Sequence, residues 1–492
     1  MSKTIFEKNS PGRKGYTLPQ NDVDFSLNDC IPAEFQRKAE IRLPQVSELD
    51  VMRHFIELSH KNHFVEKGFY PLGSCTMKYN PKISDTLVNN SAFTQLHPFQ
   101  PDADVQGSLK ILWELQNYLA EIAGFGAVSL QPVAGAHGEF TGLKVIQYYH
   151  EAKGNQKTQI ILPDSAHGTN PASASLCGYE IVEIASNDKG MVDLEALRAA
   201  VNEKTAGFML TNPNTLGIFE SQICEIAEII HAVDGLMYMD GANFNAIMGI
   251  VKPGEIGFDV MHFNLHKSFS TPHGGGGPGS GPVGVRADLA KFLPSPQVAY
   301  SESRDYYLDD SHAATSMGKV QAFYGNFLVN VRAWFYFKML GTEGVKRVSE
   351  NAVINANYLM RKLEKYYYVP YNDNCMHEFV ASGQWQKKEY GVHTIDIAKR
   401  LLDKGYHAPT IYFPLIVPEA IMIEPTETES METLDDFIQA MIDIAEEAKT
   451  SPQTLHDAPL TTPIRRADDV RAVKELNTCF DLCLMPLTCD KE

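Results

Sequence analysis

Several patterns are missing from this sequence of 492 residues, and each absence excludes a class of protein. There is no basic excess, because 43 Lys and Arg stand against 61 Asp and Glu for a formal net charge of −18. Nucleic-acid-binding proteins need basic patches. No apolar run typical of a secretion signal follows Met1. The most apolar helical stretch, residues 327–340, carries Arg332 and Lys338 and is shorter than the ~20 residues of a bilayer span. We therefore expect a cytoplasmic protein that binds neither nucleic acid nor membrane.

The eight cysteines form no disulfide framework and no metal motif. Cys479 and Cys483 are close in sequence but have no neighbouring Cys or His at the spacing of a zinc site. Free thiols are the default in a chain without a secretion signal. We therefore expect free cysteines and no metal site.

Two phosphate-binding loops are also excluded. Gly274, Gly276 and Gly279 match the spacing of a dinucleotide-binding loop, but prolines interrupt the segment and no helix with a later acidic partner follows. Lys267 precedes these glycines, whereas the lysine of a P-loop follows its glycines.

The chain divides into three parts by its patterns. Residues 1–60 are polar and interrupted by prolines, which predicts an extended N-terminal arm with one or two short helices. Residues 61–320 alternate apolar strands with helical patterns, and this predicts a large α/β domain. Residues 321–492 contain long helical patterns and shorter strands, which indicates a smaller C-terminal α+β domain.

The middle part predicts a mostly parallel sheet with helices on both faces, because its strands are continuously apolar. Ligands of such sheets bind beyond the carboxyl ends of the strands. A preceding helix should end at Gly124. The expected strands are 160–162, 181–184, 207–210, 236–239 and 259–263, with helices at 138–153, 193–202 and 221–232. In the C-terminal part we expect helices at 320–340, 343–366 and 434–449 and strands at 377–380 and 411–417.

Two segments of the α/β part are candidates for binding an anion and a planar ring. Residues 134–139 (Ala-Gly-Ala-His-Gly-Glu) lead into a helix, and small residues there let backbone N–H groups approach a phosphate. An ordinary tight turn is the alternative. His167 follows a strand and could stack on a ring, although a capping or core histidine has the same pattern.

Two further segments supply a carboxylate and an amine. Asp240 ends an apolar strand, where it could pair with a protonated pyridine nitrogen or, alternatively, cap the next helix. Lys267 lies between a strand and a glycine-rich loop, where it could form an imine (Schiff base) with an aldehyde cofactor. The alternative is a surface lysine. The order of phosphate turn, His, Asp and Lys, with Lys267 27 residues after Asp240, is what a fold-type-I enzyme of pyridoxal 5'-phosphate (PLP) requires.

At this point the sequence resembles a known family, glycine decarboxylase, the P-protein of the glycine cleavage system. Residues 264–267 with 272–279 resemble its PLP-lysine segment, and residues 71–78 (Pro-Leu-Gly-Ser-Cys-Thr-Met-Lys) resemble a second hallmark. Ser268 and Ser280 stand where the family pattern suggests Thr and Ala. The resemblance runs from about residue 12 to the 460s and corresponds to the C-terminal half of the longer P-proteins, which implies subunit 2 of the two-subunit form.

The resemblance implies roles for the site residues. Lys267, Asp240 and His167 would be catalytic: Lys267 holds PLP, Asp240 keeps the ring nitrogen protonated, and His167 stacks on the ring. Other residues would bind the cofactor, with the phosphate at the turn and the remaining groups around the ring: Gly135, Ala136, His137, Thr169, Asn212, Ala242, Asn243 and His266. The ligand of the glycine carboxylate is not identified; Arg13 is one candidate, and solvation at the surface is its alternative.

The implied reaction decarboxylates glycine and passes the aminomethyl group to the lipoyl arm of the H-protein. The implied partners are therefore glycine, the H-protein and P-protein subunit 1, in a heterotetramer with two copies of each subunit. Residues 71–78 could line the entrance for glycine or the lipoyl arm. Two alternatives stay open: another fold-type-I PLP enzyme, such as a cysteine desulfurase or an amino-acid decarboxylase, and an assembly subunit without catalysis.

Overall fold

The computed structural model describes residues 3–20, 22–24, 26, 30–38, 41, 43–274 and 278–476. The described residues form two compact units, one within 65–458 and one within 1–64 and 459–476. Each is described by itself. The pair Cys479 and Cys483 and the glycines 275–277 lie outside the described residues.

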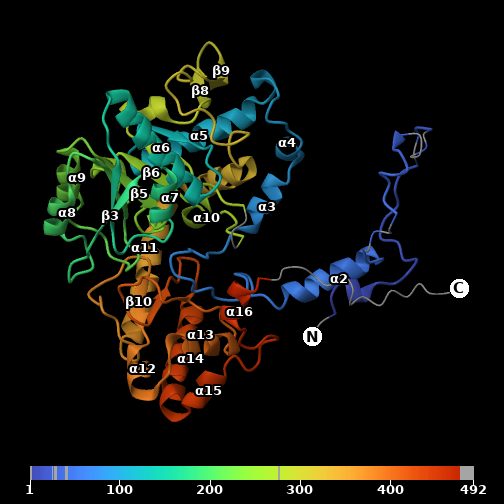
Figure 1. Ribbon diagram of the computed structural model, residues 1–492, viewed down its shortest axis with the longest axis vertical. Helices are drawn as coiled ribbons and strands as arrows, with labels where there is room; N and C mark the ends of the chain where they lie inside the picture. Colours follow the sequence, from blue (N-terminus) through green and yellow to red (C-terminus); the bar gives the residue numbers. More distant parts are fainter. Residues whose placement is uncertain are drawn as a thin grey trace. The chain divides into compact units, whose positions relative to one another are not determined.

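A seven-stranded sheet forms the centre of the larger unit (Figure 1). β3, β2, β4, β5 and β6 run parallel, while β7 is antiparallel to both β6 and β1. This confirms the mostly parallel sheet, including every strand predicted in residues 160–263. The spatial order is β1 (Ala127–Ser129), β7 (Val283–Val285), β6 (Val260–Phe263), β5 (Leu236–Gly241), β4 (Thr205–Thr211), β2 (Gln159–Pro163) and β3 (Glu180–Ile184).

Helices cover both faces of this sheet, because alternate side chains of its buried strands belong to two different cores. Met237 and Met239 of β5 pack in a core with helices α5, α8 and α9, whereas Leu236 and Tyr238 pack in a core with α6 and α7. Gly124 ends α5 in the left-handed conformation, as predicted. The bounds are α5 (Gln106–Ala123), α6 (Gly135–Lys153), α7 (Asn170–Leu176), α8 (Leu194–Ala200) and α9 (Ile223–His231).

A second, three-stranded antiparallel sheet lies beside the C-terminal helices, with the order β10 (Phe379–Ser382), β12 (Ala420–Ile423) and β11 (Thr410–Ile411). The strand predicted at 411–417 is wrong beyond Ile411, because Tyr412 adopts a left-handed φ of 58° that leaves the extended conformation. The helices are α12 (Gln384–Tyr390), α13 (Thr394–Asp403), α14 (Met431–Thr450) and α15 (Pro452–Asp457).

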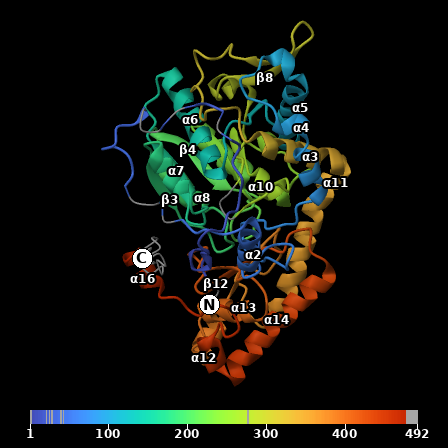
Figure 2. The ribbon, with the colours of Figure 1, turned by 90° about the vertical axis from the view of Figure 1, so that its right-hand side faces the viewer.

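The long helix α11 (Phe327–Leu363) runs between the parts of this unit that hold the two sheets (Figures 1 and 2). It is interrupted at Gly341, whose φ of 61° and ψ of −176° are not helical. The predicted break between two helices near residue 341 is therefore confirmed, whereas the first helix begins at Phe327 and not at residue 320. The proposed domain boundary at residue 320 stays a prediction.

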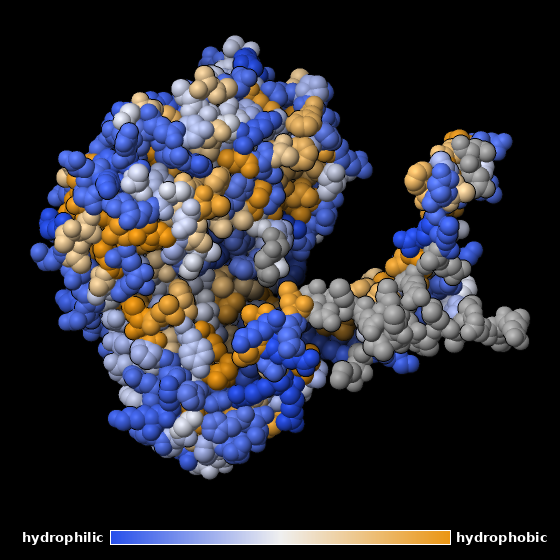
Figure 3. Space-filling model, in the orientation of Figure 1, coloured by the Kyte–Doolittle hydropathy of each residue, from blue (hydrophilic) through white to orange (hydrophobic). Residues whose placement is uncertain are grey.

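The remaining elements of the larger unit are short. They comprise α3 (Lys82–Val88), α4 (Ser91–Thr94), α10 (Leu265–Ser268), the hairpin of β8 (Gln297–Ser301) and β9 (Asp305–Asp309), and the 3-10 helices at Asp102–Asp104, Phe244–Ala246, Pro253–Glu255 and Ala287–Phe292. Hydrophilic side chains cover most of the face of this unit that Figure 3 shows, with apolar residues in scattered patches.

The smaller unit contains a 3-10 helix at Phe6–Lys8, α2 (Glu48–Ser59) and α16 (Asp469–Lys474). Ser47 and Asp50 cap α2 reciprocally, and Arg13 donates to Asp50 at 2.6 Å. Arg13, the candidate for the glycine carboxylate, thus already has a carboxylate partner. Among the described residues, no helix is long and apolar enough to cross a membrane. The five cysteines in the described part of the chain are free.

Candidate active site

The candidate site lies at the carboxyl ends of the neighbouring parallel strands β5 and β6, which bring Asp240 and Lys267 to the same edge of the sheet. Asp240 is the fifth residue of β5, and Lys267 is in α10, directly after β6. Lys267 is 6% exposed, and its Nζ donates to the backbone carbonyl of Ser74 at 2.8 Å. The structure therefore places it as a buried lysine and not as a surface one.

Asp240 is buried within a set of hydrogen-bond donors. Its Oδ2 accepts from Nδ2 of Asn170 at 2.8 Å, and its Oδ1 accepts from the backbone N–H of Ala242 at 2.8 Å. Burial by itself raises the pKa of Asp240, but the nearby imidazoles of His262 and His167 and the hydrogen bond from Asn170 outweigh burial and lower it to about 2. The carboxylate is thus ionised at neutral pH and suited to pair with a cationic ring nitrogen.

His262, which lies beside Asp240, and its hydrogen-bond partners Tyr238 and Asn264 were not predicted as site residues. Nδ1 of His262 lies 2.8 Å from the Tyr238 hydroxyl, and its Nε2 lies 3.1 Å from Nδ2 of Asn264. Burial lowers the pKa of His262 to about 4, so the ring is neutral. A histidine inside the apolar strand 259–263 was the one available signal, since a strand core rarely holds an unpaired imidazole.

His167 and Thr169 lie in the loop between β2 and α7. Because β2 and β5 run in the same direction, this loop is at the same carboxyl edge of the sheet as Asp240. Burial lowers the pKa of His167, while the Asp240 charge opposes that change. Thr169 donates to Oε1 of Glu139, and Ser173 donates to Oε2 of the same carboxylate at 2.7 Å. Burial and the charge of Asp240 raise the pKa of Glu139 to about 7. Hydrogen bonds to Glu139 therefore connect this loop to α6. Glu139 was not predicted to have a role of its own in the site.

The predicted phosphate turn is the N-terminus of α6. The helix begins at Gly135, and Ala134 before it has no side chain that can cap the first N–H groups. A Cβ at Gly135 would lie 2.3 Å from Oδ1 of Asn264, so only glycine fits there. These N–H groups and the 19-residue helix behind them favour an anion.

Two histidines flank this turn and are neutral. Nδ1 of His137 accepts from the backbone N–H of Val133 at 3.2 Å, and burial lowers the pKa of the ring. Nδ1 of His266 accepts from the N–H of Ser280 at 3.3 Å, and burial lowers its pKa to about 3. In the His266 ring Nε2 is the nitrogen left to donate to an anion, whereas a hydrogen bond to the backbone of Val320 raises the pKa of His137 in opposition to burial.

The remaining predicted residues line the ends of β4 and β5. Asn212 follows β4, and its Oδ1 accepts from the N–H of Glu220 at 3.0 Å. Asn243 donates from Nδ2 to the carbonyl of Pro213 at 2.9 Å, so it faces residues 212–213 and not the phosphate turn. Ala242 is 2% exposed.

Several buried polar atoms around this cluster have no hydrogen-bond partner among the described residues. They are Oδ1 of Asn170, Oγ1 of Thr211, Nδ2 of Asn212, Oγ1 of Thr271 and Nδ1 of His273. Buried polar atoms without a partner cost free energy unless a ligand or water satisfies them. Together with the open helix N-terminus and the ionised Asp240, they fit a polar ring that carries a phosphate.

A buried acidic cluster from the small sheet was missed entirely. Glu378 directly precedes β10 and Glu424 directly follows β12, and both are fully buried. Oε2 of Glu378 accepts from the N–H of Ser74 at 2.6 Å, and Oε2 of Glu424 accepts from the N–H of Thr76 at 2.8 Å. Burial and mutual repulsion raise the pKa of Glu378, and burial raises that of Glu424. These residues anchor segment 71–78 beside Lys267.

Among the described residues, two groups of side chains could each bring three ligand atoms to one metal ion, with these atoms within 4.8 Å of one another. They are Glu139, Asp240 and His262, and His377, Glu378 and Glu424. Protein donors already satisfy the carboxylates of both groups, from Thr169, Ser173 and Asn170 in the first and from Ser74 and Thr76 in the second. The expected lack of a metal site stays a prediction.

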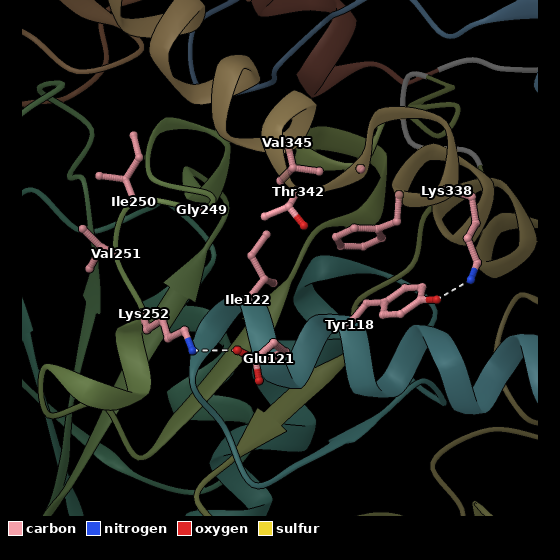
Figure 4. A pocket seen from close by; sticks show the side chains of 12 residues that line it. Tyr118, Glu121, Ile122, Gly249, Ile250, Val251, Lys252, Lys338, Thr342 and Val345 are labelled. Carbon is pink, nitrogen blue, oxygen red and sulfur yellow. Dashed lines mark hydrogen bonds and ion pairs between the residues drawn. The ribbon is translucent and has the colours of Figure 1, made fainter.

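A separate cavity of about 550 Å³ lies between α5, α11 and residues 249–252 (Figure 4). Its two lysines are both engaged, Lys252 with Glu121 and Lys338 with Tyr118. None of the predicted site residues lines it. The cavity therefore adds no group to the chemistry at Lys267.

Two family models match this sequence, over separate ranges. The family described as "Glycine cleavage system P-protein" matches residues 16–308, and the one described as "Glycine dehydrogenase, C-terminal domain" matches residues 348–466. A probable glycine dehydrogenase (decarboxylating) subunit 2 of Chloroherpeton thalassium is 56% identical over 96% of both chains. One of Caldanaerobacter subterraneus is 57% identical over 96% of this chain and 97% of the relative.

Solved structures share the fold. A glycine decarboxylase (P-protein) of the glycine cleavage system, in inhibitor-bound form, superposes with a TM-score of 0.72 at 20% identity, over 85% of this chain and 95% of that chain. A glutamate decarboxylase of Lactobacillus brevis superposes with a TM-score of 0.66 at 12% identity, over 86% and 98%. Both show the predicted fold-type-I architecture.

Proposed function

The chain belongs to the P-protein family of the glycine cleavage system, in its glycine dehydrogenase (decarboxylating) subunit 2 form, and from that premise we propose how its residues decarboxylate glycine. The observation that carries the proposal is the buried pair of Lys267 and an ionised Asp240 at the ends of adjacent parallel strands. The Lys267 amine suits the aldehyde group at one end of a PLP ring, and the Asp240 carboxylate suits the ring nitrogen at the other end.

PLP, when bound, supplies an electron sink for the pair of electrons that stays on the α carbon as CO2 leaves glycine. Lys267 would hold the cofactor covalently through Nζ, and Asp240 would keep a proton on the ring nitrogen. The N-terminus of α6, with Gly135, Ala136 and His137, would bind the phosphate together with His266. His167 would stack on the ring. Thr169, Asn212, Ala242 and Asn243 would line the pocket.

The neutral state of the surrounding groups is part of this proposal. Neutral His262 and raised pKa values at Glu139, Glu378 and Glu424 leave Asp240 as the ionised carboxylate facing the ring. The Lys267 amine, when it is not bound to the cofactor, would be placed to move a proton to or from the substrate carbon. Burial of Lys267 shields that proton from solvent exchange.

The partners are proposed on the strength of the relatives. Their name, subunit 2, supports a complex with subunit 1, and we propose two copies of each. The aminomethyl group would pass to the oxidised lipoyl arm of the H-protein, in the cytoplasm. Family membership disfavours a cysteine desulfurase, and the buried pair Lys267 and Asp240 disfavours an assembly subunit without catalysis.

Purification of the chain with subunit 1 and PLP tests the proposal. The complex should show the visible absorption band of a lysine-bound cofactor, and Lys267→Ala should abolish it. A band that survives this substitution would reject Lys267 as the attachment point. Glycine-dependent exchange of labelled CO2 in the presence of H-protein then tests the reaction, and no exchange by the complete set of proteins would reject it.

A further inference from the structure

A second buried lysine, Lys78, forms a reciprocal contact with the segment that carries Lys267. Nζ of Lys267 donates to the carbonyl of Ser74 at 2.8 Å, and Nζ of Lys78 donates to the carbonyl of Ser268 at 2.9 Å. Lys78 therefore holds the backbone next to Lys267, and Lys267 holds the backbone of the segment that carries Lys78. The two contacts join chain segments that are about 190 residues apart.

All the donors of Lys78 are used inside the protein. Besides Ser268, its Nζ contacts Oε1 of Glu427 at 2.8 Å and the hydroxyl of Tyr336 at 3.3 Å. An ammonium group has three N–H donors, so none is left for a substrate. Lys78 is 3% exposed, and Glu427 balances its charge. This distribution excludes direct binding of glycine and points to a role that acts through Ser268.

The helix that Lys78 holds is short enough to need such an anchor. α10 has four residues, Leu265–Ser268, and Asn264 before it makes no side-chain capping bond. An isolated turn of helix is unstable because its nucleus costs more conformational entropy than one hydrogen bond returns. The cation on the carbonyl of Ser268 also suits the negative C-terminal end of the turn.

The segment that carries Lys78 is itself held in an unusual shape. Ser74 and Thr76 have left-handed φ angles of 60° and 48°, which cost energy in residues other than glycine. The carboxylates of Glu378 and Glu424 accept the backbone N–H groups of these same two residues. Strain that several buried contacts maintain is typical of segments that orient a reactive group.

From these contacts we infer that Lys78 is a positioning residue for Lys267, which fixes α10 through Ser268 while Ser74 of the same segment holds the Lys267 amine. The inference rests on the proposed attachment of PLP to Lys267. It gives residues 74–78 a role at the lysine itself, where the sequence suggested only the lining of an entrance.

The test compares Lys78→Met/Glu427→Gln with wild type in the complex with subunit 1. The double substitution removes both charges together, so no buried ion is left alone. It also removes the donor to Ser268. We expect a thermal midpoint close to that of wild type but about tenfold weaker binding of PLP by the apoprotein, because a hydrogen bond from a charged donor is lost. Absorbance titration measures the affinity, and borohydride reduction followed by peptide mass measurement gives the rate of attachment at residue 267.

Two further variants make the outcome decisive. Lys78→Arg keeps the charge next to Glu427 but changes the direction of the donors, so it should keep the thermal midpoint and slow attachment; it replaces the double variant if that one does not fold. Lys82→Met, an exposed lysine paired with Glu66, is the matched control and should behave as wild type. Wild-type affinity and attachment rate in a folded Lys78 variant would overturn the inference. No attachment in wild type would instead refute the proposed function.

Discussion

Nε2 of His262 lies 3.3 Å from Oδ1 of Asp240, and the two residues are register partners on the parallel strands β5 and β6. The carboxylate stays ionised while fully buried because Nδ2 of Asn170 and the backbone N–H of Ala242 both donate to it. The two nitrogens of the His262 ring contact Tyr238 and Asn264, and these contacts fix the orientation of the ring beside Asp240. The negative charge that the proposed PLP ring nitrogen needs as its partner is therefore present on Asp240, at the end of β5.

Asp240→Asn should uncouple cofactor binding from catalysis. The amide keeps the shape but not the charge, so the ring nitrogen loses its proton and PLP becomes a weaker electron acceptor. We expect glycine-dependent CO2 exchange to fall at least about 100-fold, since removing one partner of a buried ion pair costs roughly 3 kcal/mol. The visible band should remain. Asp188→Asn, at an exposed position, is the control, and equal exchange rates in the two variants would contradict the role of Asp240.

Gly135→Ala should weaken the phosphate site. The new Cβ would meet Oδ1 of Asn264 at 2.3 Å, which forces the start of α6 away from its present position. We expect PLP affinity to fall by about tenfold or more, because the anion loses aligned N–H donors. Gly107→Ala, where the added Cβ meets nothing within 4 Å, serves as the control in α5. Absorbance titration of both apoproteins decides the comparison.

Tyr238→Phe should disturb His262 without touching Asp240. The hydroxyl that lies 2.8 Å from Nδ1 of His262 is lost, and the buried nitrogen is left without a partner. We expect the free energy of unfolding to fall by about 1–3 kcal/mol. CO2 exchange should fall less than in Asp240→Asn. A drop in exchange as large as that of Asp240→Asn, without loss of stability, would show that Tyr238 has a direct role.

Stability should fall as the pH falls from about 6.5 towards 4, in part because of His377. Burial lowers its pKa in the folded chain to about 3, and both ring nitrogens lack a hydrogen bond among the described residues. Below pH 6.5 the unfolded chain therefore binds a proton here that the folded chain does not, which favours unfolding. Above pH 7 the ring is neutral in both states and contributes nothing.

His377→Gln measures this contribution. The thermal midpoint of the wild type should decrease more between pH 7.5 and pH 5 than that of the variant, while the offset between the two proteins should be constant above pH 7. Parallel curves over the whole range would contradict the lowered pKa of His377.

The sequence predicted those parts of the fold that depend on local patterns. Continuous apolar strands, the stop at Gly124 and the break near Gly341 follow from residue type and spacing, and the structure has them all. The antiparallel β7 was not predicted, since three residues after a glycine-rich loop show no periodicity. The strand expected at 411–417 failed because nothing in the sequence signals the left-handed Tyr412.

For the site, the sequence supplied the residues that follow strands but not those that reach it from elsewhere. Asp240 and Lys267 are 27 residues apart, and a strand pattern between them predicts their adjacency. Glu378 and Glu424 meet Ser74 and Thr76 across 304 and 348 residues. No local pattern reports such contacts, because they arise only when segment 71–78 packs against the small sheet.

The interrupted helix α11 contributes to one hydrophobic core of the seven-stranded sheet and to the core of the small sheet. Val329, Ala333 and Val348 pack with the core of the seven-stranded sheet, whereas Leu359 and Leu363 pack with that of the small sheet. Because both cores contain residues of α11, neither core can unfold without exposing apolar residues of the other. We therefore expect both cores to unfold on heating in a single calorimetric peak.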